Sequence, residues 1–275
     1  MPSKIRLVSE LAGDHPGFDL ARDGAADVAV EALRAAENRH FWYLTRNRFI
    51  LDRLRRLGLG PGARLIELGC GSGSVAAALA RAGFDVTAVD GHRALLEVAA
   101  RRPESLTLWL HDLARGVDAL PDRSFEAAGL FDVIEHLDAP AAALQDALRC
   151  VRPGGLLVGT VPALMGLWSG IDERAGHKVR YTTRTLRELL RSVAGAATLE
   201  VVPFNRVLVP MIWLQRQVVG RGADTAHAIQ NLAVPVWPVN AALGGLVAVE
   251  QRLSPLLDRS GLEGSSLWFA LRRVP

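Results

Sequence analysis

The sequence predicts an α/β protein built on a doubly wound, mostly parallel sheet of seven strands, with N-terminal helices before it and a helical insertion ahead of the last strand. Short apolar runs alternate with stretches of helical periodicity in residues 59–204, which is the pattern of parallel strands joined by right-handed crossovers. A glycine-rich turn directly follows the first of these runs. Of the 275 residues, 49% are hydrophobic, which suffices for a large core without disulfides.

The first 58 residues are expected to form an arm and cap helices. Residues 1–24 are polar, and we interpret them as a loose arm. From Ala25 to Leu57 apolar positions recur at helical spacing with arginines on the opposite face, and Gly58 is a typical helix stop.

The core of the sheet is predicted over residues 59–204, and the chain returns to it in residues 261–275. Strands are expected at 64–68, 85–89, 105–110, 125–132, 154–162, 197–204 and 266–274. Helices are expected at 74–83, 93–102, 139–151 and 183–193.

The insertion at 205–260 is apolar and mostly helical in pattern. Residues 225–249 contain no Asp, Glu, Lys or Arg, and a stretch of that length could cross a bilayer. Pro235 and Pro238 interrupt such a helix, so we expect buried helices or a segment resting on a membrane surface instead. A lid over the site and a homodimer interface are also compatible with this composition.

The formal net charge is only +3, and no dense basic stripe is present, which argues against a nucleic-acid partner. The two cysteines, Cys70 and Cys150, do not make a disulfide framework, so a reducing compartment is expected. The first residues contain no apolar stretch of signal-peptide length. These features predict a cytoplasmic protein, with peripheral membrane contact through 205–260 left open.

The glycine-rich turn spans Glu67 to Ser74 and has the sequence ELGCGSGS. A dinucleotide-binding turn has the spacing G-x-G-x-x-G, but here Ser74 occupies the third glycine position. Glu67 stands two residues before Gly69 and would repel phosphates. The turn therefore favours a ligand that has no phosphate there and that carries a cationic amino-acid end.

The stretch IELGCGSGSVAAALA resembles motif I of class I S-adenosylmethionine-dependent methyltransferases, and RPGG at 152–155 is similar to the turn before the fifth strand of that family. The resemblance covers about residues 60–204 and the final strand. Within the family, the sequence is similar to the small-molecule branch, which includes ubiquinone-biosynthesis O-methyltransferase-like proteins. It implies a Rossmann-like fold and S-adenosyl-L-methionine as the cofactor. The turn residues that it assigns to the cofactor are Glu67, Gly69, Cys70, Gly71 and Gly73. For Cys70 a small filler is the alternative.

Residues after the next three strands complete the cofactor site that the resemblance implies. They are Asp90, Gly91, His111, Asp112, Leu113 and Phe131. Asp90 is expected to accept hydrogen bonds from two ribose hydroxyls, and Asp112 and Leu113 are expected beside the adenine. A helix N-cap is the alternative for both aspartates.

Ligands of doubly wound sheets bind outside the carboxyl ends of the strands, which places the segment after the fourth strand at the reaction centre. His136 is expected there as a base for a hydroxyl acceptor, with helix capping as its structural alternative. We predict no metal ion. The family resemblance leaves one alternative open, a divalent cation held by Asp132, Glu135 and His136.

The loop between the fifth strand and the next helix contains GHKVRYT, which resembles a GH-x-RRYT stretch of small-molecule methyltransferases. His177 and Tyr181 are therefore further catalytic candidates, with His177 as a base or acceptor contact. The alternative is a loop clamp in which Asp172 or Glu173 pairs with Arg180.

The N-terminal helix is a candidate cap over the cofactor. In relatives with an HFW...R stretch, aromatic and arginine side chains lie near the cofactor, which here indicates Trp42, Tyr43 and Arg46. A cation–π contact between these rings and the sulfonium is one expectation. A helix that merely packs on the sheet is the alternative.

The combined interpretation is a methyltransferase that acts on a small, apolar molecule, with oxygen favoured over nitrogen or carbon as the acceptor atom. FDVI after the fourth strand replaces the N/D-PP-Y/F motif, which argues against methylation of DNA adenine. Three rival functions are a cyclase or pericyclase of the same fold, a membrane-associated binding module, and a nicotinamide oxidoreductase. The missing third glycine and Glu67 disfavour the last of these.

Overall fold

One sheet organises the chain in the computed structural model, which describes residues 5–7, 26–113, 116, 118, 120–219, 234–258 and 260–274. Within these residues the strand order is β1-β4-β3-β2-β5-β6-β8-β7, and every neighbouring pair is parallel except the two that involve β8. The strands are β1 Ile5–Leu7, β2 Arg64–Leu68, β3 Asp85–Asp90, β4 Thr107–Leu110, β5 Phe125–Phe131, β6 Val151–Pro162, β7 Ala196–Phe204 and β8 Ser266–Arg273.

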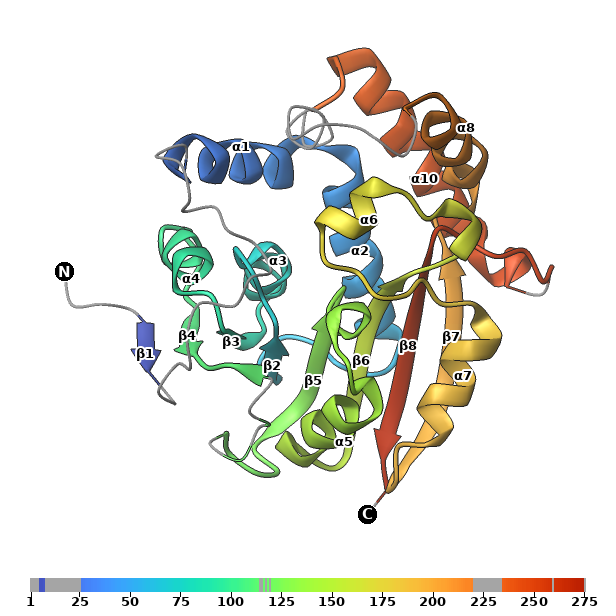
Figure 1. The fold of residues 1–275 in the computed structure, drawn as a ribbon. Helices are drawn as coiled ribbons and strands as arrows, with labels where there is room; N and C mark the ends of the chain where they lie inside the picture. Colours follow the sequence, from blue (N-terminus) through green and yellow to red (C-terminus); the bar gives the residue numbers. More distant parts are fainter. Residues whose placement is uncertain are drawn as a thin grey trace.

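Helices cover both faces of the sheet and the edge at which β5 and β6 end (Figure 1). They are α1 Ala26–Arg39, α2 Phe41–Arg56, α3 Ser74–Arg81, α4 Arg93–Ala100, α5 Pro140–Cys150, α6 Gly170–Arg174, α7 Thr183–Arg191, α8 Val209–Val219 and α10 Trp237–Leu257. Short 3-10 turns are η2 Ile134–His136, η3 Met165–Leu167 and η4 Arg206–Leu208. The predicted doubly wound, mostly parallel α/β fold is confirmed.

The N-terminal expectations need one correction. The arm predicted as loose contains β1, which extends the seven predicted strands to eight, and Ile5 pairs with Leu108 of β4. Its alternation of apolar and charged residues suits a strand that covers an otherwise open sheet edge. The helical pattern predicted from 25 to 57 forms two helices, which are separated at His40 because His40 adopts an extended backbone and its ring accepts a hydrogen bond from the N–H of Trp42.

The hydrophobic core lies in two layers, one on each face of the sheet. One layer packs α2, α3 and α4 against the sheet, for example through Ile50, Leu79 and Leu96. The other layer packs α5 and α7 against the opposite face through Leu144 and Leu186. All five side chains are fully buried, so the strand ends that carry the polar residues are held by a rigid scaffold.

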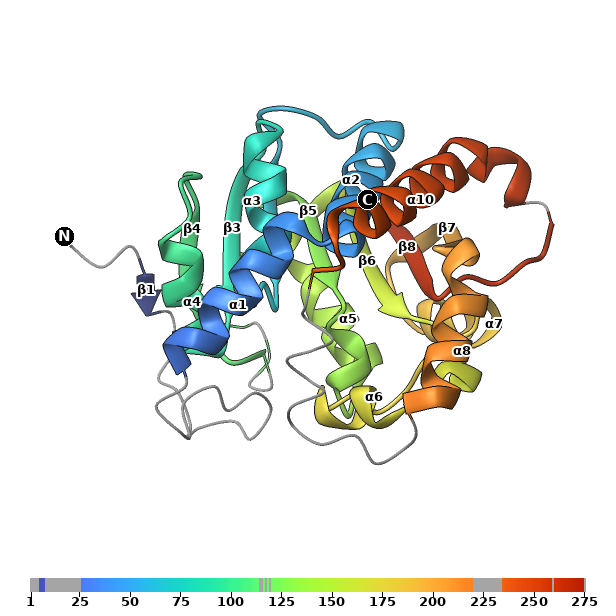
Figure 2. The same cartoon turned by 90° about the horizontal axis from the view of Figure 1, so that it is seen from above.

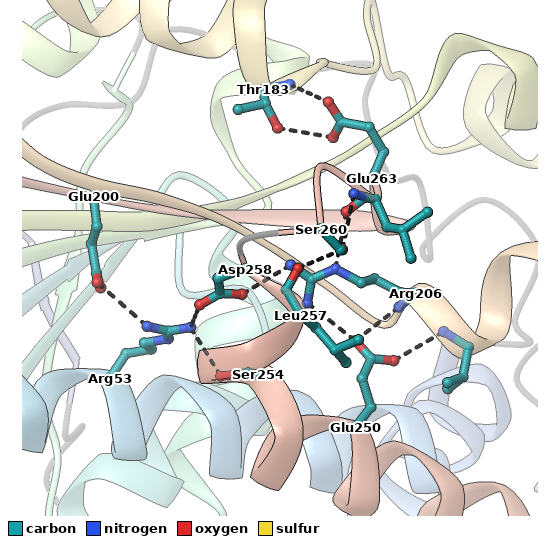
Figure 3. A network of polar contacts seen from close by, with 12 residues as sticks. Arg53, Thr183, Glu200, Arg206, Glu250, Ser254, Leu257, Asp258, Ser260 and Glu263 are labelled. Carbon is teal, nitrogen blue, oxygen red and sulfur yellow. Dashed lines mark hydrogen bonds and ion pairs between the residues drawn. The ribbon is translucent and has the colours of Figure 1, made fainter.

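The insertion before β8 packs on the N-terminal helices, and α10 lies beside α2 (Figure 2). Arg53 of α2 is the centre of a polar network that joins them (Figure 3). Its guanidinium donates to Glu200 of β7, and to Ser254 and Asp258 at the end of α10. Residues 220–233 of the predicted insertion lie outside the described residues.

A second part of this network fixes η4, which leads directly into α8 (Figure 3). The carboxylate of Glu250 on α10 accepts the backbone N–H groups of Arg206 and Val207, each at 2.9 Å. The guanidinium of Arg206 donates to Asp258 at 2.9 Å. The position of α8 over the sheet edge is therefore set by buried contacts with α10.

Candidate active site

The glycine-rich turn leaves an open space at the end of β2. The N–H groups of Gly69 and Cys70 both donate to the carbonyl of Val89, which anchors the turn to β3. Gly69 has φ +77°, and a Cβ there would lie 2.7 Å from Cγ2 of Val133. Gly71 has φ +55°, but a Cβ on it would meet no atom of the described residues within 4 Å. A ligand can therefore approach the backbone closely at Gly71.

Asp90, at the end of β3, is almost saturated by protein donors. Its Oδ2 accepts the N–H of Gly71 at 2.7 Å, and its Oδ1 accepts the N–H of His92 at 2.8 Å. The His92 ring Nδ1 lies 3.1 Å from the same Oδ1, and this hydrogen bond raises the pKa of His92. A carboxylate offers about four acceptor positions, so these three contacts leave about one for a ligand, and the hydrogen bonds from ribose hydroxyls stay a prediction. The N-cap of α4 is His92, which Asp90 holds in place.

Glu67 supplies a buried carboxyl behind the turn. It is 2% exposed, and within the described part of the chain its Oε2 has no hydrogen-bond partner. Burial raises its pKa to about 8, although the nearby charge of Arg46 acts in the opposite direction. A buried carboxyl with one unpartnered oxygen fits a ligand with a cationic end, as S-adenosylmethionine has.

The remaining residues predicted to contact the cofactor surround the same end of the sheet. The N–H of His111 donates to the carbonyl of Asp90, and a Cβ on Gly91 would lie 3.5 Å from Cα of Asp112. Segments after β3 and β4 therefore meet beside the turn. Of the other residues predicted to contact the cofactor, Cys70 and Phe131 are buried, and Leu113 is partly buried and packs against the core. For all residues that the sequence analysis assigned to the cofactor, the contact with the cofactor stays a prediction.

Arg46 of α2 connects the cofactor side to a neighbouring cavity. Its Nη1 lies 2.7 Å from Oδ2 of Asp132, and the Oδ1 of Asp132 accepts the hydroxyl of Thr160. The guanidinium carbon lies 4.8 Å from the ring centroid of Trp42 and 5.5 Å from that of Tyr43. The expected cation on these rings is therefore Arg46 itself, which competes with the proposed sulfonium contact.

The cavity beside Arg46 has a volume of about 310 Å³. It lies where α2, the end of β5, the loop after α6, and α8 converge. Its lining residues are Trp42, Tyr43, Arg46, Asp132, Glu135, Pro162, His177, Arg180, Ile212, Arg216, Ser265 and Ser266. Among the three predicted catalytic residues, His177 lines this cavity, whereas His136 and Tyr181 do not. Tyr181 is buried in the core, where burial raises its pKa to about 12.

His177 is oriented by a carboxylate behind it. Its Nδ1 lies 3.0 Å from Oδ1 of Asp172, and this contact assigns the ring proton to Nδ1 and leaves Nε2 as the basic nitrogen. Its Nε2 lies 4.0 Å from Oε1 of Glu135. Glu135 is fully buried without a hydrogen-bond partner among the described side chains, and burial, with the charge of Asp132, holds its pKa well above its usual range. A carboxylate-held histidine at a cavity wall is the geometry of a general base.

The loop clamp weighed as an alternative for His177 is also present. Asp172 accepts the Nε–H of Arg180 at 2.7 Å in addition to its contact with His177. The two interpretations are therefore compatible, because one carboxylate serves both the loop and the ring.

The residues expected for a divalent cation are not brought together as one set. Ligand atoms of Glu135, His136 and His177 lie within 4.8 Å of one another, and the rings of the two histidines meet edge to face. Asp132, the third expected ligand, is instead engaged by Arg46 and Thr160.

Sequence analysis left open a lid over the site from residues 205–260, but it did not single out the two residues of α8 that line the cavity. Ile212 and Arg216 line it, and Arg216 donates to Oδ2 of Asp172 at 2.9 Å. One feature of the sequence could have indicated this role: Arg216 is the single charge in the otherwise uncharged stretch VPMIWLQRQVV.

Comparisons with known proteins place these observations in a family. The sequence pattern of a family described as a methyltransferase domain matches residues 41–200. A ubiquinone biosynthesis O-methyltransferase of Alkalilimnicola ehrlichii is 32% identical over 156 residues, covering 52% of this chain and 62% of that protein. A malonyl-[acyl-carrier protein] O-methyltransferase of Pseudescherichia vulneris is 30% identical over 185 residues, covering 64% of this chain and 70% of that protein.

A solved structure shows the same fold at low sequence identity. Phosphoethanolamine N-methyltransferase 2 of Haemonchus contortus, in complex with phosphomonomethylethanolamine and S-adenosylhomocysteine, superposes with a TM-score of 0.60. The identity is 17%, and the match covers 96% of this chain and 61% of that chain.

Proposed function

Because the chain belongs to the family of S-adenosylmethionine-dependent methyltransferase domains, we propose that it transfers a methyl group to an oxygen atom of a small molecule bound in the 310 Å³ cavity. The observation that carries this proposal is His177, which lines the cavity and is held by Asp172. A base is needed when the acceptor must lose a proton, as a hydroxyl does. Both curated relatives described above carry the name O-methyltransferase, which supports oxygen as the acceptor atom.

Different residues of the chain would bind the two ligands, S-adenosylmethionine and the methyl acceptor. When bound, S-adenosylmethionine would supply a methyl group activated by a positively charged sulfur. Gly71 and Asp90 would hold its ribose and amino-acid part, and Glu67 would offer a carboxyl to its cationic end. His177 would take the acceptor proton at Nε2, while Asp172 keeps the ring in the required orientation.

The size and walls of the cavity support a small acceptor with apolar parts. Trp42, Pro162 and Ile212 contribute apolar surface, and about 310 Å³ is at the lower end of typical small-molecule sites. Since α8 contributes Ile212, the predicted insertion acts as a wall or lid of the acceptor site in this proposal.

The insertion also carries apolar surface that faces away from the cavity. Trp213 of α8 is 51% exposed and Trp237 of α10 is 80% exposed. Among the described helices, none combines the length and apolarity needed to pass through a bilayer. We propose that this surface contacts a membrane surface, and contact with a second copy of the chain is the alternative.

The proposal is tested by incubating the purified chain with S-adenosylmethionine and a panel of phenols, catechols and aliphatic alcohols. Formation of S-adenosylhomocysteine together with an acceptor heavier by one methyl group is the expected result. A product without S-adenosylhomocysteine would indicate a cyclase instead. Methylation restricted to amines or carbon atoms would contradict the O-methyltransferase assignment.

A further inference from the structure

We propose that the acceptor carries an oxyanion, as a carboxylate or phosphate does, and that Arg216 of α8 binds it. This inference rests on the proposed function, because it concerns the occupant of the same cavity. The apolar walls of the cavity alone would suggest a neutral acceptor. The inference adds that the acceptor carries a negative charge.

The first observation is an excess of positive charge at one end of the cavity. Asp172 is shared by the guanidinium groups of Arg180 and Arg216, at 2.7 and 2.9 Å. It is the one carboxylate within ion-pair distance of either arginine among the described residues. At the other end Arg46 and Asp132 neutralise each other at 2.7 Å. Two guanidinium groups on one carboxylate leave one positive charge uncompensated.

Glu135 does not remove this excess. It lines the cavity, and its carboxyl is fully buried without a hydrogen-bond partner in the described part of the chain. Among the described residues it forms no ion pair with Arg180 or Arg216, whose carboxylate partner is Asp172. His177, which also lines the cavity, is held by Asp172 and contributes no negative charge.

Arg216 is the better placed of the two arginines to meet a ligand. Arg180 uses its Nε for Asp172 and its Nη1 for the carbonyl of Ala163. Arg216 is fixed to Asp172 through Nη1, and among the described residues no other acceptor occupies the second edge of its planar fork. Its side chain is 14% exposed against 7% for Arg180.

The close approach of the two guanidinium groups supports the same conclusion. Burial, followed by the charge of Arg216, lowers the pKa of Arg180. A second anion beside the pair would relieve this repulsion. Such an anion would be held by charge-assisted hydrogen bonds from two largely buried guanidinium groups.

Benzoate and benzamide are suitable probes, because they have the same shape and differ in charge. Each is titrated by calorimetry into the chain loaded with S-adenosylhomocysteine. Benzoate is expected to bind the wild-type chain at least about tenfold more tightly than benzamide, the usual gain from a charged acceptor. Arg216→Gln should abolish the preference, and Arg216→Lys should retain part of it. Arg252→Gln, the same change at an exposed position of α10, should leave the preference unchanged.

Equal affinity of the wild-type chain for the two probes, or binding of neither, would overturn the proposal. It would also be overturned if Arg216→Gln bound S-adenosylhomocysteine normally and still preferred benzoate. Failure of the wild-type chain to bind S-adenosylhomocysteine is a separate result, which would contradict the proposed function instead.

Discussion

The backbone N–H of Gly71 donates to Oδ2 of Asp90 across 2.7 Å, and this bond joins the glycine-rich turn on β2 to the end of the neighbouring strand β3. The side chain of Asp90 thereby shapes the turn and still offers one acceptor position to a ligand. Cofactor affinity should depend on both functions of this carboxylate.

Replacement of Asp90 by Ala should weaken binding of S-adenosylhomocysteine by about 1–3 kcal/mol, because the ribose hydroxyl and the N–H of Gly71 both lose their acceptor. Isothermal titration calorimetry measures this change directly. His92→Ala is the matched control, since it removes a ring that contacts Asp90 without removing the carboxylate. An affinity of Asp90→Ala equal to that of the wild type would rule out the ribose role.

Glu67 should make the stability of the ligand-free chain depend on pH. Its pKa is raised from 4.5 to about 8 in the folded state, so between these values the folded chain holds a proton that the unfolded chain has released. The free energy of unfolding therefore falls as pH rises through this window, by at most about 1.4 kcal/mol per pH unit, and levels off above it.

Urea denaturation at several pH values tests this dependence. Glu67→Gln should make the fall in unfolding free energy between pH 4.5 and about 8 less steep, and the fall that remains includes the contribution of Glu135, whose pKa is also raised. The same substitution at the exposed Glu188 should leave it in place. Identical pH profiles for the wild type and Glu67→Gln would mean that the buried carboxyl is not protonated.

His177→Gln should reduce kcat by about 10²- to 10⁴-fold, the usual contribution of a general base. The measurement is the rate of S-adenosylhomocysteine formation with the best acceptor of the panel. Binding of S-adenosylhomocysteine should not change, because His177 lines the acceptor cavity. His136→Gln should have a smaller effect, since His136 is not among the cavity-lining residues. A larger loss in His136→Gln than in His177→Gln would reverse the assignment.

Glu250→Ala should lower the free energy of unfolding by about 3 kcal/mol, because the buried N–H groups of Arg206 and Val207 lose their acceptor and the charge of Arg206 loses a partner. Guanidinium chloride denaturation measures this loss. Glu250→Gln retains one acceptor oxygen and should cost less. A stability change within about 0.5 kcal/mol for the alanine variant would show that the network does not hold α10 and η4 together.

The parts of the site that follow from local sequence were predictable. The turn from Glu67 to Ser74 and the acid at Asp90 are defined by short-range spacing around strands, and parallel strands bring their carboxyl ends to one edge. The spacing of four residues between Trp42 and Arg46 also predicts that they meet on one helix face. The structure shows that contact, whereas the sequence interpretation assigned both side chains to the cofactor.

The acceptor cavity could not be derived in the same way, because its charges come from distant segments. Arg216 and Asp172 are 44 residues apart, and no periodicity relates α8 of the insertion to α6. The choice between His136 and His177 likewise depends on which side chain faces the cavity. Sequence spacing placed both histidines near the reaction centre. The packing of η2, which carries His136, and of the loop after α6, which carries His177, shows that only His177 lines the cavity.

The most direct test of the account is a calorimetric titration of S-adenosylhomocysteine into the wild-type chain and into Gly71→Ala. The added Cβ meets no described atom within 4 Å, so the variant should fold with a loss of only about 1–2 kcal/mol from its positive φ. The account predicts one bound ligand per wild-type chain and strongly weakened binding in the variant, because the methyl group occupies the space of the ligand. No binding to the wild-type chain, or equal binding to both, would contradict it.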